Sequence, residues 1–168
     1  MPLVALVVTP LAGRWSDRFG ARVLSVMGLV MTALGFFVLA HVGETPHPGH
    51  IFGGMTLIGA GLGLFTAPNS SALMSTVPAH QLGLASGLQA TMRNLGIAGG
   101  AAAMAAIVAT RFAAHGGGVL GASPDGGALH AGAFALATRD AYLAMATLAM
   151  VAALLALKQP GPQAATEP

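Results

Sequence analysis

The chain has 168 residues, of which 55% are hydrophobic and only 7% are Asp, Glu, Lys or Arg. A soluble domain carries charge on roughly a quarter of its residues, so this composition excludes a soluble globular domain. It indicates an all-α membrane protein instead, because only helices and closed barrels satisfy their backbone hydrogen bonds in hydrocarbon. The net charge of +2 comes without a basic patch interleaved with aromatic residues, which gives no support to a nucleic-acid partner.

Five apolar segments follow one another along residues 1–158, which form the predicted transmembrane region. A helix needs about 20 apolar residues to cross the bilayer, so the first segment, 1–12, is too short. It is expected to be the end of a helix that begins upstream, in a longer protein. Four segments are expected to span completely: 23–42, 51–74, 84–110 and about 141–157.

The connections between these segments carry turn residues. Short loops are expected at 43–49 and 76–82, and a long Gly/Ala-rich connection between Arg111 and Arg139. Residues 159–168 are expected to form a disordered tail. The basic residues of segment 13–22 place that segment in the cytoplasm by the positive-inside rule, which also puts the tail there and the connection outside.

The most specific motif lies in this cytoplasmic segment, Gly-Arg-Trp-Ser-Asp-Arg-Phe-Gly-Ala-Arg. A glycine permits the tight turn, and the Asp can cap a helix start or pair with an Arg. A plain positive-inside loop is the simpler alternative. The pattern resembles the signature loop of the major facilitator superfamily, and the matching residues are Gly13, Asp17, Arg18, Gly20 and Arg22. The resemblance implies a conformational latch there, although Ala21 stands where the family commonly has a basic residue.

Two later stretches, 59–68 and 82–96, resemble the C-terminal half of the fourteen-helix drug:proton antiporters of the EmrB/QacA type. The resemblance extends from about Pro10 to Leu157. It implies a partial major-facilitator C-terminal helix bundle, with about four full transmembrane helices and a partial one. The whole protein is then expected to bind a small, drug-like hydrophobic substrate and protons, in the bacterial inner membrane.

Arg93 is the one charge deep within a predicted span. A charge at that depth costs a few kcal/mol and marks a position facing protein or water. Gln89, Arg93, Gly96 and Gly100 share one helix stripe. The stripe belongs either to a substrate or proton path, or to a structural contact in which Arg93 bonds carbonyl groups or Asn69 on the neighbouring helix.

Glycine pairs four residues apart allow close helix packing in lipid. Gly59 with Gly63, and Gly96 with Gly100, are the expected packing pairs, although a chain with 24 glycines produces such spacings by chance as well. These pairs favour a packed bundle over isolated membrane anchors.

No Asp or Glu falls inside the four predicted spans, and the six histidines are scattered in or beside loops. A coupling carboxylate is therefore expected upstream, in the N-terminal half. No nucleophile with a base, phosphate loop or metal-ligand spacing is present, so neither an enzyme nor a cofactor or metal site is expected. The alternative function is a small non-transporting scaffold or assembly subunit that packs through its Gly-rich helix faces.

Overall fold

The computed structural model describes residues 20–42, 47–116 and 127–158. These residues form four long helices: α2 (Ala21–Ala40), α3 (Pro48–Ser75), α4 (Leu82–Ala114) and α5 (Gly127–Lys158), with the short 3₁₀ helix η1 (Ala79–Gln81) before α4. Each long helix contains an apolar stretch of membrane-spanning length. The described part of the chain is thus an all-α, multi-pass bundle, as the composition predicts.

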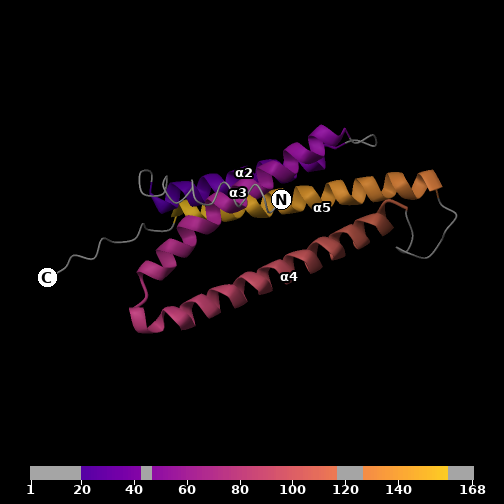
Figure 1. Ribbon diagram of the computed structural model, residues 1–168. Helices are drawn as coiled ribbons and strands as arrows, with labels where there is room; N and C mark the ends of the chain where they lie inside the picture. Colours follow the sequence, from indigo (N-terminus) through magenta and orange to yellow (C-terminus); the bar gives the residue numbers. More distant parts are fainter. Residues whose placement is uncertain (1–19, 43–46, 117–126, 159–168) are drawn as a thin grey trace.

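The helices run in alternating directions, so their connections lie at two opposite ends (Figure 1). The start of α2, helix η1 and the end of α5 share one end. The ends of α2 and α4 and the starts of α3 and α5 share the other. This arrangement is what four successive crossings of a membrane require.

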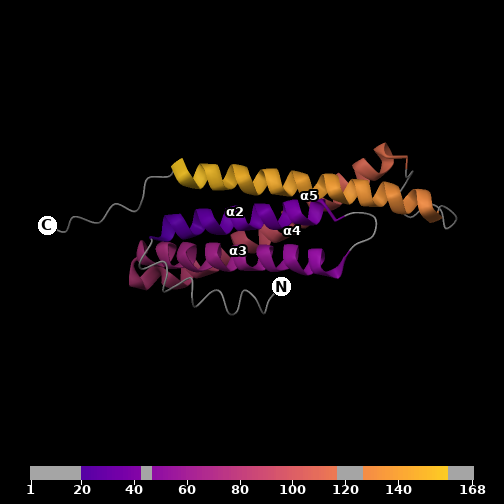
Figure 2. The same cartoon turned by 90° about the horizontal axis from the view of Figure 1, so that it is seen from above.

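Helix α2 is the centre of the bundle and packs between α3 and α5 (Figure 2). Four glycines bring α2 and α3 into close contact: Gly28 and Gly35 on α2, and Gly54 and Gly61 on α3. A Cβ atom added at Gly28 would lie 2.5 Å from the carbonyl oxygen of Gly61. Van der Waals contact between backbones therefore replaces the hydrophobic drive that lipid cannot supply.

The predicted packing glycines fall into two groups. Gly59 and Gly63 on α3 are buried, but the contact with α2 is made by Gly54 and Gly61. Gly96 and Gly100 on α4 are exposed, and an added Cβ at either would meet no atom of the described residues within 4 Å. The spacing of four residues predicted pairs of small residues, but it did not indicate which helix faces which neighbour.

Helix α4 is attached to the rest of the bundle at its two ends and diverges from it in between (Figure 1). Only 6% of its spanning window is buried, against 39% for α3. At its far end Phe112 and Val108 pack on Ala133 and Ala137 of α5. The large apolar side chains along α4, such as Leu84 and Leu95, are exposed and therefore suited to lipid or to another helix.

The start of α5 differs from the sequence-based expectation. The helix begins at Gly127, well before residue 141, so Arg139 and Asp140 lie inside it. The segment is rich in alanine, which is the best helix former, and its glycines delay rather than prevent the helix. The predicted partial helix 1–12 and the tail 159–168 lie outside the described residues.

Candidate functional site

A cleft of about 660 Å³ opens between the second half of α3 and the first half of α4. Polar and apolar side chains line it together. From α3 come Leu62, Phe65, Thr66, Asn69 and Ser70, and from α4 come Ser86, Gln89, Ala90, Met92, Arg93, Asn94 and Ile97. The cleft lies between two membrane-length helices, where polar groups are rare unless they serve a purpose.

One hydrogen bond closes the cleft at its narrow end. The Gln89 side-chain amide Nε2 donates to Ser70 Oγ at 2.7 Å and so links α4 to α3. Both residues are partly buried, which strengthens the bond and makes an unpaired partner costly. This bond restrains the angle at which α3 and α4 diverge from the turn that joins them.

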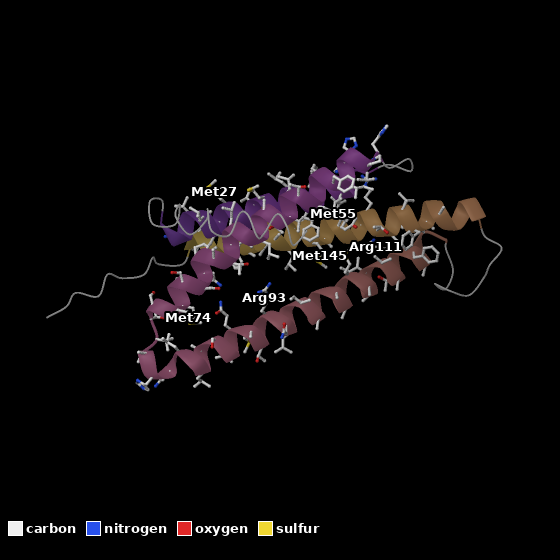
Figure 3. The ribbon with its side chains drawn as sticks, in the orientation of Figure 1. Met27, Met55, Met74, Arg93, Arg111 and Met145 are labelled. Atoms are coloured by element: carbon white, nitrogen blue, oxygen red, sulfur yellow. The ribbon has the colours of Figure 1, made fainter. Side chains whose placement is uncertain are left out.

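Arg93 lies about 16 Å along α4 from Leu82, estimated from the helical rise of 1.5 Å per residue. Half the thickness of the hydrocarbon core is about 15 Å, so this position is close to mid-depth. The side chain projects from α4 toward the side on which α3 lies (Figure 3). Of the described residues that line the cleft, Arg93 is the charged one and gives them a net positive charge.

The cleft brings together Gln89 and Arg93 of the predicted α4 stripe and Asn69 of α3, which the sequence suggested as a partner of Arg93. It adds Ser70, Ser86 and Asn94, which sequence reasoning did not single out. Their helical spacing offered a signal: Ser70 follows Asn69 directly, and Ser86, Gln89 and Arg93 are three and four residues apart. Gly96 and Gly100 are not among the lining residues.

A second polar cluster joins α4 to α5 at the opposite end of α4. His115 Nε2 lies 3.1 Å from Asp140 Oδ2, and Arg111 Nε lies 3.7 Å from the same oxygen. The cluster stands beside the apolar contact of Phe112 with α5. Along α4 it is about 27 Å from Arg93, or 18 residues at 1.5 Å each.

Comparison with known proteins then decides the family. The family model described as Major Facilitator Superfamily matches residues 1–168. The chain belongs to this superfamily.

Relatives within the superfamily are named as transporters. An uncharacterized transporter of Escherichia coli strain K12, YebQ, is 37% identical over 115 residues, which cover 68% of this chain and 25% of the relative. The multidrug resistance protein Stp of Mycobacterium tuberculosis is 33% identical over 108 residues, 64% of this chain and 20% of the relative. A triacylglyceride transporter of Mycobacteroides abscessus is 38% identical over 120 residues, 61% of this chain and 22% of the relative.

The matched region spans a quarter or less of the length of each of these relatives. The chain therefore shares its family, but only part of its length, with proteins named as transporters. The named activities of the relatives differ from one another, so they leave the substrate open.

The loop predicted to act as a latch lies only partly within the described residues. Gly20 precedes α2 with a φ of 82°, a left-handed conformation that glycine adopts at no steric cost. Its carbonyl accepts from Leu24 N at 3.4 Å, which starts the helix. Arg22 is exposed at the same end of the bundle. Gly13, Asp17 and Arg18 lie outside the described residues.

One expectation about the chemistry is wrong. Asp140 was expected just before the last span, predicted to begin at about residue 141, but it lies within α5 and within the apolar stretch Ala131–Lys158. His115, expected in or beside a loop, is the C-cap of α4 and contacts Asp140. The reason is that α4 and α5 both extend beyond the spans predicted for them, 84–110 and about 141–157. The added turns bring polar residues at the ends of the two helices together.

Proposed function

We propose that this chain forms part of a proton-coupled multidrug efflux antiporter of the EmrB/QacA type in the bacterial inner membrane. The observation that carries the proposal is the polar cleft between α3 and α4, with Arg93 near mid-depth. Secondary transporters bind their substrate near the bilayer midplane, between helices that rock against each other. A relative named as a multidrug resistance protein supports this choice of substrate class.

The lining of the cleft suits an amphipathic, drug-like compound. Phe65, Met92 and Ile97 offer apolar surface, and the methionine adapts to ligands of different shape. Asn69 and Arg93 offer hydrogen-bond donors that orient a polar group of the ligand. A site of this mixed character accepts many compounds, because few of its contacts demand one geometry.

The proposed transporter needs a second half. The exposed apolar length of α4, with Gly96 and Gly100 on its surface, is the face on which helices of an N-terminal half would pack. The end that carries Gly20 and Arg22 is the cytoplasmic end by the positive-inside rule. By itself the chain supplies one wall of the substrate path, and we expect no transport from it alone.

The test of this function measures drug-dependent proton movement in proteoliposomes. The chain is reconstituted alone and together with the N-terminal half of a superfamily exporter, and the internal pH is followed after addition of cationic dyes. Only the paired preparation should exchange dye for protons. Efflux from vesicles that contain the chain alone would contradict the assignment.

The role of Arg93 is tested in the paired preparation. Because a hydrogen bond to a charged group contributes about 1.5–3 kcal/mol, Arg93→Gln should weaken apparent substrate affinity by about tenfold or more. Lys158→Gln, which removes a charge at the exposed end of α5, is the matched control and should behave like the unchanged chain. Equal transport by both variants would remove Arg93 from the substrate path.

A non-transporting scaffold is the second candidate, and the exposed face of α4 favours it as well. The two functions differ in their partner. A scaffold should copurify with an unrelated membrane complex, and deleting the scaffold from cells should leave dye efflux unchanged. Deleting a transporter subunit should reduce dye efflux, and that subunit should not copurify with an unrelated complex.

A further inference from the structure

Asp140 is the only acidic residue in the segments that the structure describes, and it lies inside a membrane-length helix. Its Oδ2 atom faces His115 Nε2 at 3.1 Å and Arg111 Nε at 3.7 Å. An ionisable group within a transmembrane helix is costly and by default marks a functional position. The proposed drug cleft makes no use of this group, since its partner Arg111 lies about 27 Å from Arg93 along α4.

His115 stands at the C-cap of α4, directly after the last helical residue, Ala114. The carboxyl end of a helix carries partial negative charge and stabilises a nearby cation. The His115 side chain is 32% exposed, so water reaches the ring. An imidazole is the side chain that gains and loses a proton between about pH 5 and 8.

We infer that His115 and Asp140 form a proton-binding site whose occupancy controls how firmly the far end of α4 is held to α5. In the neutral ring the hydrogen on Nε2 is donated to Asp140 Oδ2. Nδ1 then takes a proton from water and the ring becomes a cation, while the Nε2–H bond to the carboxylate is kept. The bond is already charge-assisted through the carboxylate, and the added proton turns it into an ion pair between two full charges.

Arg111 is the positively charged partner of Asp140 when the His115 ring is neutral. Its guanidinium keeps one positive charge near Asp140 when the ring is neutral, so the carboxylate is not left unpaired. Arg111 is the more exposed partner, with 59% of its side chain accessible, so water screens that pair more than the pair with His115. The added proton therefore acts through His115.

The other titratable groups at this end, within the residues that the structure describes, belong to different contacts. On α2, His41 Nδ1 lies 2.9 Å from the Phe37 carbonyl oxygen, and the ring lines a cavity of about 280 Å³ with Arg139 of α5. Tyr142 of α5 stacks on Phe36 of α2. On α3, the rings of His47 and His50 lie near each other, with centroids 6.2 Å apart.

Few other contacts hold α4 within the part of the chain that the structure describes. At this end Phe112 and Val108 pack on Ala133 and Ala137 of α5. Between the two ends α4 is exposed. Strengthening or weakening one polar bond therefore changes the balance between an attached and a detached helix end.

The chain has no cysteine, so spin labels can be placed without removing native residues. Labels at Ala109→Cys and Ala131→Cys, both exposed positions, report the separation of α4 and α5 near the cluster. Electron paramagnetic resonance in nanodiscs at pH 8 and pH 5 should show a detached population that falls by up to about fivefold at pH 5, because an ion pair between partly exposed groups is gained. Transport is not needed for this readout, so it stands whether or not the chain exports drugs.

His115→Gln keeps a hydrogen-bond donor but cannot take up the proton, and should abolish the pH response. Asp140→Asn should abolish it too, and Asp140→Glu should restore it. His50→Gln at the same end and His80→Gln at the opposite end are the matched controls and should keep it. A response that survives His115→Gln, disappears in His50→Gln, or is absent in the unchanged chain would overturn the inference.

Discussion

The contact between α2 and α3 makes the sharpest prediction about stability. At Gly61, an added Cβ would lie 2.5 Å from the Gly28 carbonyl oxygen, 2.5 Å from Thr32 Oγ1 and 2.8 Å from Thr32 N. Two of these three atoms belong to the backbone of α2 and cannot rotate away. Gly61→Ala therefore forces the helices apart by about 0.9 Å, the step from 2.5 Å to the 3.4 Å at which ordinary contact begins.

Overpacking a well-packed interface costs about 1–3 kcal/mol. In addition, Gly54 loses part of its close dispersion contact with Leu39 and Gly35 of α2 when the helices separate. We expect Gly61→Ala to lower the free energy of unfolding by about 2 kcal/mol. The measurement is equilibrium unfolding of the chain in mixed micelles at increasing mole fraction of dodecyl sulfate, followed by circular dichroism.

Gly96→Ala is the matched control, because an added Cβ there meets nothing within 4 Å among the described residues. Alanine is favoured over glycine in a helix by about 1 kcal/mol, so this variant should be as stable as the unchanged chain or more stable. If Gly61→Ala and Gly96→Ala unfold at the same dodecyl sulfate fraction, the close approach of α2 and α3 through glycines is refuted.

Three further predictions concern the attachment of α4. Phe112→Ala removes a ring that is 4% exposed, and should lower the free energy of unfolding by about 3 kcal/mol. It should also increase the distance between spin labels on α4 and α5. An unchanged distance would show that the ring does not attach α4 to α5. Ser70→Ala and Gln89→Leu, combined in a double-mutant cycle, should give a coupling of about 1 kcal/mol in the same unfolding measurement, and additive effects would exclude the hydrogen bond. Asp140→Asn should detach the end of α4 more than Arg139→Gln does, because Arg139 faces the cavity beside His41; the reverse order of the spin-label distances would contradict the assigned contacts.

Sequence reasoning identified the helices because the apolar runs are long and the loops carry prolines. It placed α2 and α3 within a few residues of their observed bounds, since Gly20 and Pro48 mark real helix starts. It missed the first part of α5 because the absence of charge was used to locate the spans. A helix in a membrane protein continues past its uncharged stretch wherever alanine-rich sequence and polar partners allow, as they do around Asp140.

The candidate site was predictable only along one helix at a time. Helical periodicity places Gln89 and Arg93 on one stripe of α4, and that stripe does line the cleft. The crossing of α3 and α4 decides which α3 residue contacts Gln89. That crossing depends in turn on the turn through η1 and on the packing of α3 against α2. For this reason Ser70 could not be chosen over Asn69 as the partner.

Helix α4 is held differently from its neighbours, and this bears on how the bundle could move. Glycine contacts seat α2 closely against α3, and such packed contacts allow few intermediate positions. In contrast, α4 is held at one end by Gln89 and Ser70, and at the other by Phe112 and the pair of His115 with Asp140. The proposed substrate residue Arg93 lies between these two attachments. A change at either end therefore tilts the helix that carries Arg93, whereas α2 and α3 form the support against which it tilts.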